Sequence, residues 1–318
     1  MARRELQKED YTVGWVCALP IELAAAQEML DEEHCRQQYH DNIYTLGRIG
    51  WHNVVIAGLP GGQTGTVSAA VIAAKMIETF KSIRIGLMVG IGGGVPLGEA
   101  DIRLGDVVIS KPYNMHGGVV QYDFGKTTPS GFERTGSLNT PPTILLNAVT
   151  NIQANHIRGR CRLPDYFMKL NSLPVFARES AGQDILFEAT YNHEGAAQCV
   201  KCSKDYLISR ELREQEVVVH YGTIASGNHV MRDGVERDRV SAQLGGVLCF
   251  EMEAAGLMNS FPCLVIRGIC DYADSHKNKK WQAYAAGTAA ACAKEILSVI
   301  PPEEISKTRK AELAIASC

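Results

Sequence analysis

The chain has 318 residues, of which 46% are hydrophobic and 21% charged, and its formal net charge is −3. This composition is typical of one large globular α/β domain and argues against a strongly basic nucleic-acid-binding surface, although a local basic patch for phosphates remains open. No apolar run reaches the roughly 18 to 20 residues of a membrane helix, and the charged residues 1–10 lack a secretory signal pattern. We therefore expect a cytoplasmic protein whose partners are small molecules, with no nucleic acid and no membrane.

Strand and helix patterns alternate from the start of the chain. Residues 11–19 predict a buried strand, and Pro20 opens a helix predicted over 21–30 as its first-turn proline. Glu22 therefore lies in the first helical turn, just past the end of a strand. There it either complements the helix dipole or faces a ligand.

A glycine-rich loop at 59–65 follows a predicted hairpin, whose strands are 44–48 and 53–59, and precedes a helix predicted over 66–80. Such a loop could hold an anion or a water molecule on its backbone N–H groups. It could equally be a tight turn between strand and helix.

A second glycine run, 90–94, ends the buried strand predicted at 83–89. It lacks the G-x-G-x-x-G register of a dinucleotide-binding loop, so we expect no nicotinamide or other cofactor. We interpret these glycines, Gly92 among them, as letting the backbone approach a ligand closely.

The middle of the chain contains a strand predicted at 104–110 and a turn-rich segment at 117–136. From 141 to 213 the composition becomes mixed and polar, with one helix predicted over 143–155. We interpret residues 141–213 as an insertion packed on the main sheet.

Within this insertion, His193, Cys199 and Cys202 form an H-x5-C-x2-C cluster. Zinc would need a fourth ligand, for which Cys161 is the candidate, and the spacing is not that of a standard zinc finger. We therefore expect no bound metal and a simple pair of loop thiols.

Two strand patterns near the C-terminus, 247–250 and 263–266, run into charged side chains: Glu253 after the first, Arg267 and Asp271 after the second. In open α/β sheets, ligands bind at the carboxyl ends of strands. If the chain stays extended from Arg267 to Asp271, both side chains leave on the same face. An acid and a base are then expected to face one crevice.

The segments around this region complete the predicted organisation. A strand is predicted at 217–225, and an alanine-rich helix at 281–299 is expected to pack on the sheet. We predict one domain over 1–300, which includes the insertion, and a frayed tail or linker over 301–318.

Taken together, the motifs resemble those of the nucleoside phosphorylase and nucleosidase superfamily over roughly residues 11–300. The matching segments, in the family's order, are VGWVCALPIELAA with Glu22, GIGGG at 90–94, IRLGDVVIS, IASGNHVM, FEMEAAG and VIRGICDYAD. The site resembles most closely that of methylthioadenosine/S-adenosylhomocysteine nucleosidases. The whole sequence, with its insertion, resembles fungal phosphorylase-like domains that are often fused to NACHT or ankyrin regions.

This resemblance implies a three-layer α/β/α sandwich with a central mixed sheet, and a homodimer or larger homo-oligomer. It also implies cleavage of an N-glycosidic bond through a ribosyl-cation-like transition state. Asp271 would protonate purine N7, and Glu253 would bind the ribose hydroxyls and face the developing cation. Glu22, assisted by Arg267, would orient or deprotonate the attacking water.

The resemblance supplies further candidates for substrate binding. Met252 would pack against the sugar, and Arg267, Gly92, Asn228, Val230 and Phe250 are the other candidates. Val230 stands where related nucleosidases have an aromatic residue that stacks on the base. The base preference therefore stays open, with adenine favoured.

Three functions compete for this site. The first is a purine nucleosidase that hydrolyses adenosine-type nucleosides or nucleotides, ATP among them. The second is a phosphorylase that yields ribose 1-phosphate, and the third is a catalytically silent nucleotide-binding domain. Glu22, Glu253 and Asp271 together disfavour the silent domain.

A phosphorylase would need basic residues for its phosphate. None occurs from 85 to 96, and Arg84 would lie more than about 15 Å from Gly90 in a strand that rises about 3.3 Å per residue. We therefore expect hydrolysis, unless an arginine from elsewhere, such as Arg48 or one from a neighbouring subunit, completes the site.

Overall fold

The structure is a computed structural model that describes residues 3–35, 42–96, 100–195 and 199–315. Its centre is a mixed sheet of 11 strands. The main path has the order β10-β6-β13-β5-β1-β4-β3-β2. A branch leaves β5 through β12 and continues through β11 to β7.

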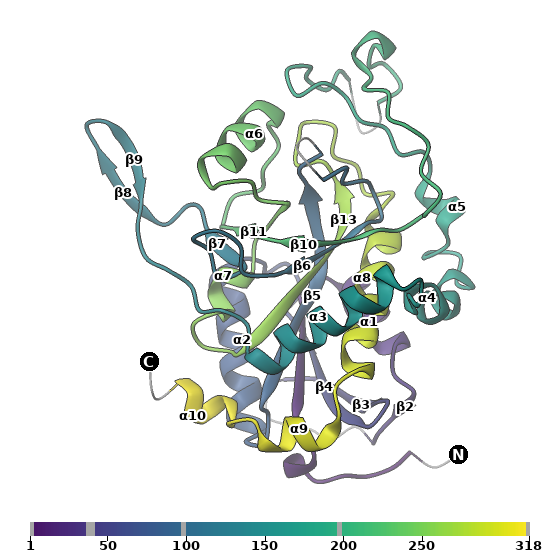
Figure 1. Ribbon diagram of the computed structural model, residues 1–318, viewed down its shortest axis with the longest axis vertical. Helices are drawn as coiled ribbons and strands as arrows, with labels where there is room; N and C mark the ends of the chain where they lie inside the picture. The colour runs from purple at the N-terminus through teal and green to yellow at the C-terminus, as the bar shows by residue number, and fades with distance from the viewer. Residues whose placement is uncertain (1–2, 36–41, 97–99, 196–198, 316–318) are drawn as a thin grey trace.

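Four parallel strands form the middle of the sheet: β1 (Val13–Cys17), β4 (His52–Gly58), β5 (Ile85–Gly94) and β13 (Cys263–Asp271). Most of their residues are buried because helices cover both faces of the sheet, which explains the continuous apolar runs in their sequences. Their carboxyl ends lie at one edge of the sheet (Figure 1).

Seven further strands extend the sheet. They are β2 (Glu32–Glu33), β3 (Tyr44–Ile49), β6 (Val107–Ser110), β7 (Val119–Gln121), β10 (Val219–Gly222), β11 (Ile224–Ser226) and β12 (Cys249–Glu251). The predicted hairpin is confirmed, because β3 and β4 pair antiparallel from Tyr44↔Ala57 to Ile49↔His52. β6 runs antiparallel to β13, so the sheet is mixed.

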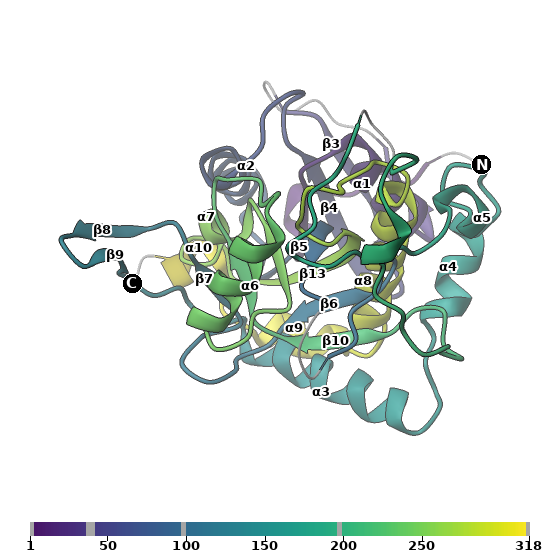
Figure 2. The same cartoon turned by 90° about the horizontal axis from the view of Figure 1, so that it is seen from above.

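Helices cover the two faces of the sheet (Figures 1 and 2). On one face lie α1 (Pro20–Glu28) and α8 (Gln282–Ser298), with α3 (Thr143–Ile157) and α4 (Leu163–Asn171) packed against α8. The other face is covered by α2 (Thr66–Thr79) and α7 (Ala254–Leu257). The predicted three-layer α/β/α sandwich is confirmed.

Small residues let α8 approach the sheet closely. A Cβ atom at Gly268 of β13 would lie 1.8 Å from the carbonyl oxygen of Ala285 on α8. The alanine-rich sequence of α8 presents the matching surface, and most of its residues are buried. This contact fixes β13, whose carboxyl end carries Asp271.

The end of the chain differs from the expected frayed tail. It forms α9 (Pro302–Lys307) and α10 (Ala311–Ile315), and residues 316–318 lie outside the described part. Ile305 and Ala311 are buried, and the N–H of Ala311 donates to the carbonyl of Ile83 at 2.8 Å. The segment is not frayed because two well-spaced apolar anchors hold it although its average composition is charged; its role as a linker stays a prediction.

Several elements were not predicted. The turn-rich segment contains a projecting hairpin of β8 (Gly125–Thr128) and β9 (Gly131–Arg134), seen at the left of Figure 1. A further helix, α6 (Gly234–Gln243), begins at Asp233, whose side chain accepts hydrogen bonds from the N–H groups of Val235 and Glu236.

The remaining short pieces are α5 (Arg178–Ala181) and two 3-10 helices, Lys8–Asp10 and Lys204–Tyr206. After α5 the chain runs toward the edge of the sheet where β5 and β13 end (Figure 1). In the part of the chain that is described, no helix has the length and apolarity that crossing a membrane requires.

Candidate active site

A cavity of about 270 Å³ lies where the central strands end, and its walls come from segments far apart in the sequence. The three predicted catalytic residues, Glu22, Glu253 and Asp271, all line it. Glu22 follows β1, Glu253 follows β12 and Asp271 ends β13. The sheet thus gathers three carboxyl groups at one place, as the sequence predicted.

Glu22 is fixed by backbone N–H groups from two elements. One carboxylate oxygen accepts from Ala18 at 2.7 Å and from Leu19 at 2.9 Å, and the other accepts from Ile91 at 2.8 Å. A carboxylate offers about four acceptor positions, so roughly one remains for a group in the cavity. Glu22 is therefore held rigidly with one acceptor position to spare.

Gly90 makes room for this arrangement. A Cβ atom there would lie 2.4 Å from Oε1 of Glu22 and 2.6 Å from Nη1 of Arg267. Gly90 therefore lets both charged groups lie against β5.

Arg267 is completely buried and does not line the cavity. Its guanidinium forms an ion pair with Glu251, lies 3.4 Å from a carboxylate oxygen of Glu253, and donates to the carbonyl of Ile91 at 3.3 Å. Arg267 thus lies beneath the cavity, where it positions the carboxyl groups. Direct contact with substrate, as the sequence suggested, does not fit this placement.

The regular extended backbone on which the same-face arrangement of Arg267 and Asp271 depended is interrupted. Between Ile269 and Asp271 the pairing with β5 shifts, because Ile269 lies opposite Gly92 whereas Asp271 lies opposite Gly93. This bulge breaks the strict alternation of side chains. Asp271 can therefore line the cavity while Arg267 stays below it.

Glu253 accepts a hydrogen bond from the N–H of Gly65 at 3.1 Å. The glycine-rich loop at 59–65 thus directs one of its amides to a carboxylate of the protein. Asn228 fixes the same loop, since its side-chain oxygen accepts from the N–H and the hydroxyl of Thr66 at 3.1 and 3.0 Å. Asn228 itself does not line the cavity.

The buried guanidinium of Arg267 affects the protonation of Glu22 and Glu253. Burial raises the pKa of Glu22 above its usual value, although Arg267 and three backbone N–H groups lower it. Burial also raises the pKa of Glu253 to about 7, against the lowering effect of Arg267 and with a further increase from the neighbouring carboxyls of Glu251 and Glu22. Glu253 therefore changes charge near neutral pH.

Asp271 has an ion-pair partner that the sequence did not suggest. The ammonium group of Lys277 lies 2.9 and 3.0 Å from its two carboxylate oxygens, and the N–H of Ala273 donates to it at 2.8 Å. Although burial alone would lower the pKa of Lys277, Asp271 raises it. Together these contacts fix the carboxyl group of Asp271 at the cavity wall.

The other substrate-binding candidates are placed as follows. Gly92, Phe250, Met252 and Val230 line the cavity, with Val230 about half exposed. Gly92 brings its backbone close to that of Phe250, since a Cβ there would lie 3.1 Å from the Phe250 carbonyl oxygen. Four of the six predicted substrate-binding residues thus line the cavity, and Arg267 and Asn228 support it from outside.

Sequence reasoning missed two charged residues of the site, Glu251 and Lys277. Glu251 lines the cavity, and its carboxylate also accepts from the N–H groups of Glu253 and Ala254 at the start of α7. Glu251 is the last residue of β12, and this position at a strand end could have indicated a site residue. Lys277 lies in a stretch that reads as a polar loop, and no motif predicts that it folds back onto Asp271.

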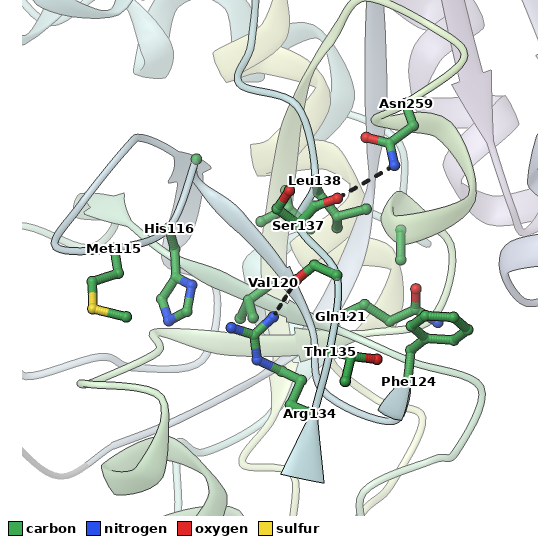
Figure 3. Close-up of a pocket in the computed structure, with 14 residues that line it drawn as sticks. Met115, His116, Val120, Gln121, Phe124, Arg134, Thr135, Ser137, Leu138 and Asn259 are labelled. Atoms are coloured by element: carbon green, nitrogen blue, oxygen red, sulfur yellow. Dashed lines mark hydrogen bonds between the residues drawn. The ribbon is translucent and has the colours of Figure 1, made fainter. Parts of the chain in front are cut away.

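A second cavity, of about 330 Å³, lies between β7, the β8–β9 hairpin and the residues around α7 (Figure 3). Two of its polar side chains bond to backbone carbonyls, Arg134 to Gly136 and Asn259 to Ser137. Among its described lining residues none carries a carboxyl group. The carboxylate-lined cavity is therefore the candidate active site.

Known proteins resemble both the sequence and the fold. The family model of the phosphorylase superfamily matches residues 12–299. A nucleotide-binding leucine-rich repeat (NLR)-like protein of Hyaloscypha variabilis is 47% identical over 320 residues, which cover 96% of this chain and 31% of that protein. The chain thus spans about a third of that relative.

Two further relatives are nucleosidases. The 5'-methylthioadenosine/S-adenosylhomocysteine nucleosidase of Mycobacterium bovis is 26% identical over 91% of this chain and 97% of its own length. The ATP nucleosidase Cap17 of Escherichia coli is 25% identical over 86% of this chain and 48% of its own length, so the chain spans about half of it.

A solved structure shows the same fold. The 5'-methylthioadenosine/S-adenosylhomocysteine nucleosidase from S. pneumoniae, determined with a transition-state inhibitor, superposes with a TM-score of 0.59 at 19% identity. The superposition covers 91% of this chain and all of that one.

Proposed function

The chain belongs to the phosphorylase superfamily, and we propose that it is a purine nucleosidase. It would hydrolyse the N-glycosidic bond of an adenosine-type nucleoside or nucleotide to free base and sugar. The observation that carries this proposal is the meeting of Glu22, Glu253 and Asp271 at one cavity. Relatives named as nucleosidases, which include an ATP nucleosidase, support it.

Asp271 is the proposed general acid. A purine leaves more readily when N7 receives a proton, so a carboxyl group must stand beside that nitrogen. Lys277 and the N–H of Ala273 hold the carboxyl of Asp271 in one orientation at the cavity wall. Because both groups donate to it, Asp271 must first take up a proton, from Lys277 or from solvent, before it can pass one to N7. Its fixed position removes the cost of orienting the group during the reaction.

Glu253 is the proposed partner of the ribose. As a carboxylate it can accept hydrogen bonds from ribose hydroxyls and place negative charge near the cation that develops at the sugar. The N–H of Gly65 and the guanidinium of Arg267 both donate to the carboxyl of Glu253, so these contacts suit its ionised form. Met252, the preceding residue on the wall, supplies an apolar contact for the sugar.

Glu22 is the proposed residue that orients or deprotonates the attacking water. Three of its acceptor positions are filled by backbone N–H groups, and the remaining one can take a water in the cavity. The pKa of Glu22, raised by burial, makes the carboxylate a better base than one in water.

Phosphorolysis fits the cavity less well than hydrolysis. Of the described lining residues, the basic ones are Lys277, which is paired with Asp271, and His229. Arg267 is buried below and neutralised by Glu251 and Glu253, and Arg48 on β3 pairs with Glu32. A phosphate dianion would lose its hydration without gaining the bidentate guanidinium contacts that compensate for that loss.

We predict that cleavage proceeds at the same rate with and without inorganic phosphate. Product analysis by chromatography should find free ribose, or its 5'-substituted form, under both conditions. Phosphate-dependent cleavage with ribose 1-phosphate as product would contradict hydrolysis and would require an arginine from another subunit. A known phosphorylase assayed in the same buffers provides the positive control.

A catalytically silent nucleotide-binding domain is the second candidate. The NLR-like relative, of which this chain corresponds to about a third, favours it because such a domain can serve a larger protein by binding alone. Binding of a nucleoside without release of its base by the wild-type chain would support this candidate over the nucleosidase.

A further inference from the structure

His193, Cys199 and Cys202 come together beside the loop that follows β13. Nδ1 of His193 lies 3.5 Å from Sγ of Cys199 and 3.4 Å from Sγ of Cys202, and the three ligand atoms all lie within 4.8 Å of one another. A tetrahedral zinc, with Zn–S of about 2.3 Å and Zn–N of about 2.0–2.1 Å, places an N and an S ligand about 3.5 Å apart. The observed spacing therefore matches a zinc ligand set.

Hydrogen bonds alone explain the position of the two sulfur atoms around Nδ1 of His193 less well than a bound cation does. Nδ1 of an imidazole carries either one proton or one lone pair in the ring plane, so it can form one well-directed hydrogen bond. Here two sulfur atoms approach Nδ1 at nearly equal distances. A cation between them would be a shared partner for all three ligand atoms.

His276 provides a second, independent observation. Its ring is more than nine-tenths buried, and neither nitrogen has a partner at hydrogen-bond distance; Nδ1 lies 3.7 Å from a carboxylate oxygen of Asp274, which leaves Nε2 without a polar contact. Leaving Nε2 of a buried imidazole unsatisfied costs free energy, and coordination to a metal would satisfy it. The ring of His276 stands edge-on to that of His193, with 5.6 Å between centroids.

The expected fourth ligand, Cys161, lies elsewhere. It is exposed and groups with His156 and Glu295 at the C-terminal part of α8. The cluster instead faces residues 274–276, because the N–H of His193 donates to Oγ of Ser275 at 2.9 Å. A fourth ligand is thus to be sought in this loop. His276 is the candidate there, and its ring would have to turn toward the ion, because its nitrogens lie outside the group within 4.8 Å.

We propose that His193, Cys199 and Cys202 bind one zinc ion per chain, with His276 as the fourth ligand. The ligand set of two sulfurs and two imidazole nitrogens suits zinc, which prefers four such ligands in closed structural sites. This proposal revises the expectation of a metal-free thiol pair. It stands independently of the proposed nucleosidase activity.

Such a site would link two parts of the chain. His193, Cys199 and Cys202 belong to the predicted insertion, whereas His276 directly precedes Lys277, the partner of Asp271. A zinc ion that joins them would fasten the insertion to the loop that positions the proposed general acid. The metal would therefore act as a structural clamp outside the cavity.

Metal analysis of the full chain, purified without chelator, tests this proposal. We expect about one zinc per chain, and less than about 0.1 after Cys199→Ser or Cys202→Ser. Cys35→Ser is the matched control, because Cys35 lies outside the cluster and bonds to the carbonyl of Arg3. Cys161→Ser should also keep the metal. Less than about 0.1 zinc in the wild type, both as purified and after incubation with zinc and desalting, would overturn the site.

Two further measurements keep the test valid if a serine variant fails to fold. A zinc chelator should lower the Tm of the wild type by at least about 2 °C, since it removes a ligand of the folded state.

Thiol titration of the chelated, denatured wild type without reductant should find all ten cysteines. An unchanged Tm, or only eight thiols because Cys199 and Cys202 form a disulfide, would count against zinc.

His276→Ala tests the fourth ligand separately. The variant should release zinc to a chromogenic chelator at least about ten times faster than the wild type, because three ligands hold the ion less tightly than four. Release at the wild-type rate would remove His276 from the site.

Discussion

Asp271→Asn is expected to lower base release by about a hundred- to ten-thousand-fold, which is the usual loss when a general acid is removed. Asparagine keeps the shape of the side chain and one oxygen that can accept from the N–H of Ala273, but it has no proton to give to purine N7. The rate should be measured on an adenosine-type substrate. A substrate with an activated leaving group should lose much less.

Asp101→Asn is the matched control for this variant. It makes the same chemical change at a surface carboxylate that pairs with Arg103 and does not line the cavity. Circular dichroism and binding of an uncleavable nucleoside analogue should show that Asp271→Asn is folded. Near-native turnover by a folded Asp271→Asn enzyme would remove Asp271 as the acid.

Glu253→Gln is expected to lower the rate of cleavage by about a hundred- to a thousand-fold while substrate affinity changes little. The glutamine oxygen can still accept from Gly65, but the charge that faces the ribosyl cation is lost. Because that cation forms only on the way to the transition state, the loss should fall on kcat. A change confined to KM would mean that Glu253 only anchors the ribose.

The pH profile gives Glu253 a second test. Burial raises its pKa to about 7, so the ionised form required for catalysis accumulates only as the pH rises through that value. In the wild type, kcat/KM should therefore increase with pH around 7. The Glu253→Gln variant should not show this increase. Glu295→Gln, which alters a buried carboxyl on α8 away from the cavity, should keep both the rate and the increase.

Much of the fold could be predicted because its central strands are continuous apolar runs. β1, β5 and β13 are buried on both faces, and a strand of this kind is visible in a single sequence. The elements that were missed depend on sparse or polar signals. α6 is marked by the N-cap Asp233, and α9 is anchored by the single buried residue Ile305.

The site could be predicted in part for the same reason. Glu22, Glu253 and Asp271 follow strand ends, and parallel strands bring such ends to one edge of the sheet. The bulge before Asp271 was not foreseeable from alternation, and neither was the burial of Arg267 below the cavity. Lys277 escaped notice because its ion pair forms only when the loop after β13 folds back.

Base and sugar release from a panel of nucleosides and nucleotides tests the central claim most directly. The panel should contain adenosine, a 5'-thio-substituted adenosine, ATP and the corresponding guanine compounds, and chromatography should quantify both products. The account predicts equimolar adenine and free sugar from at least one adenosine-type compound, with both lost in Asp271→Asn. A folded wild-type chain that binds members of the panel but releases no base from any of them would contradict it.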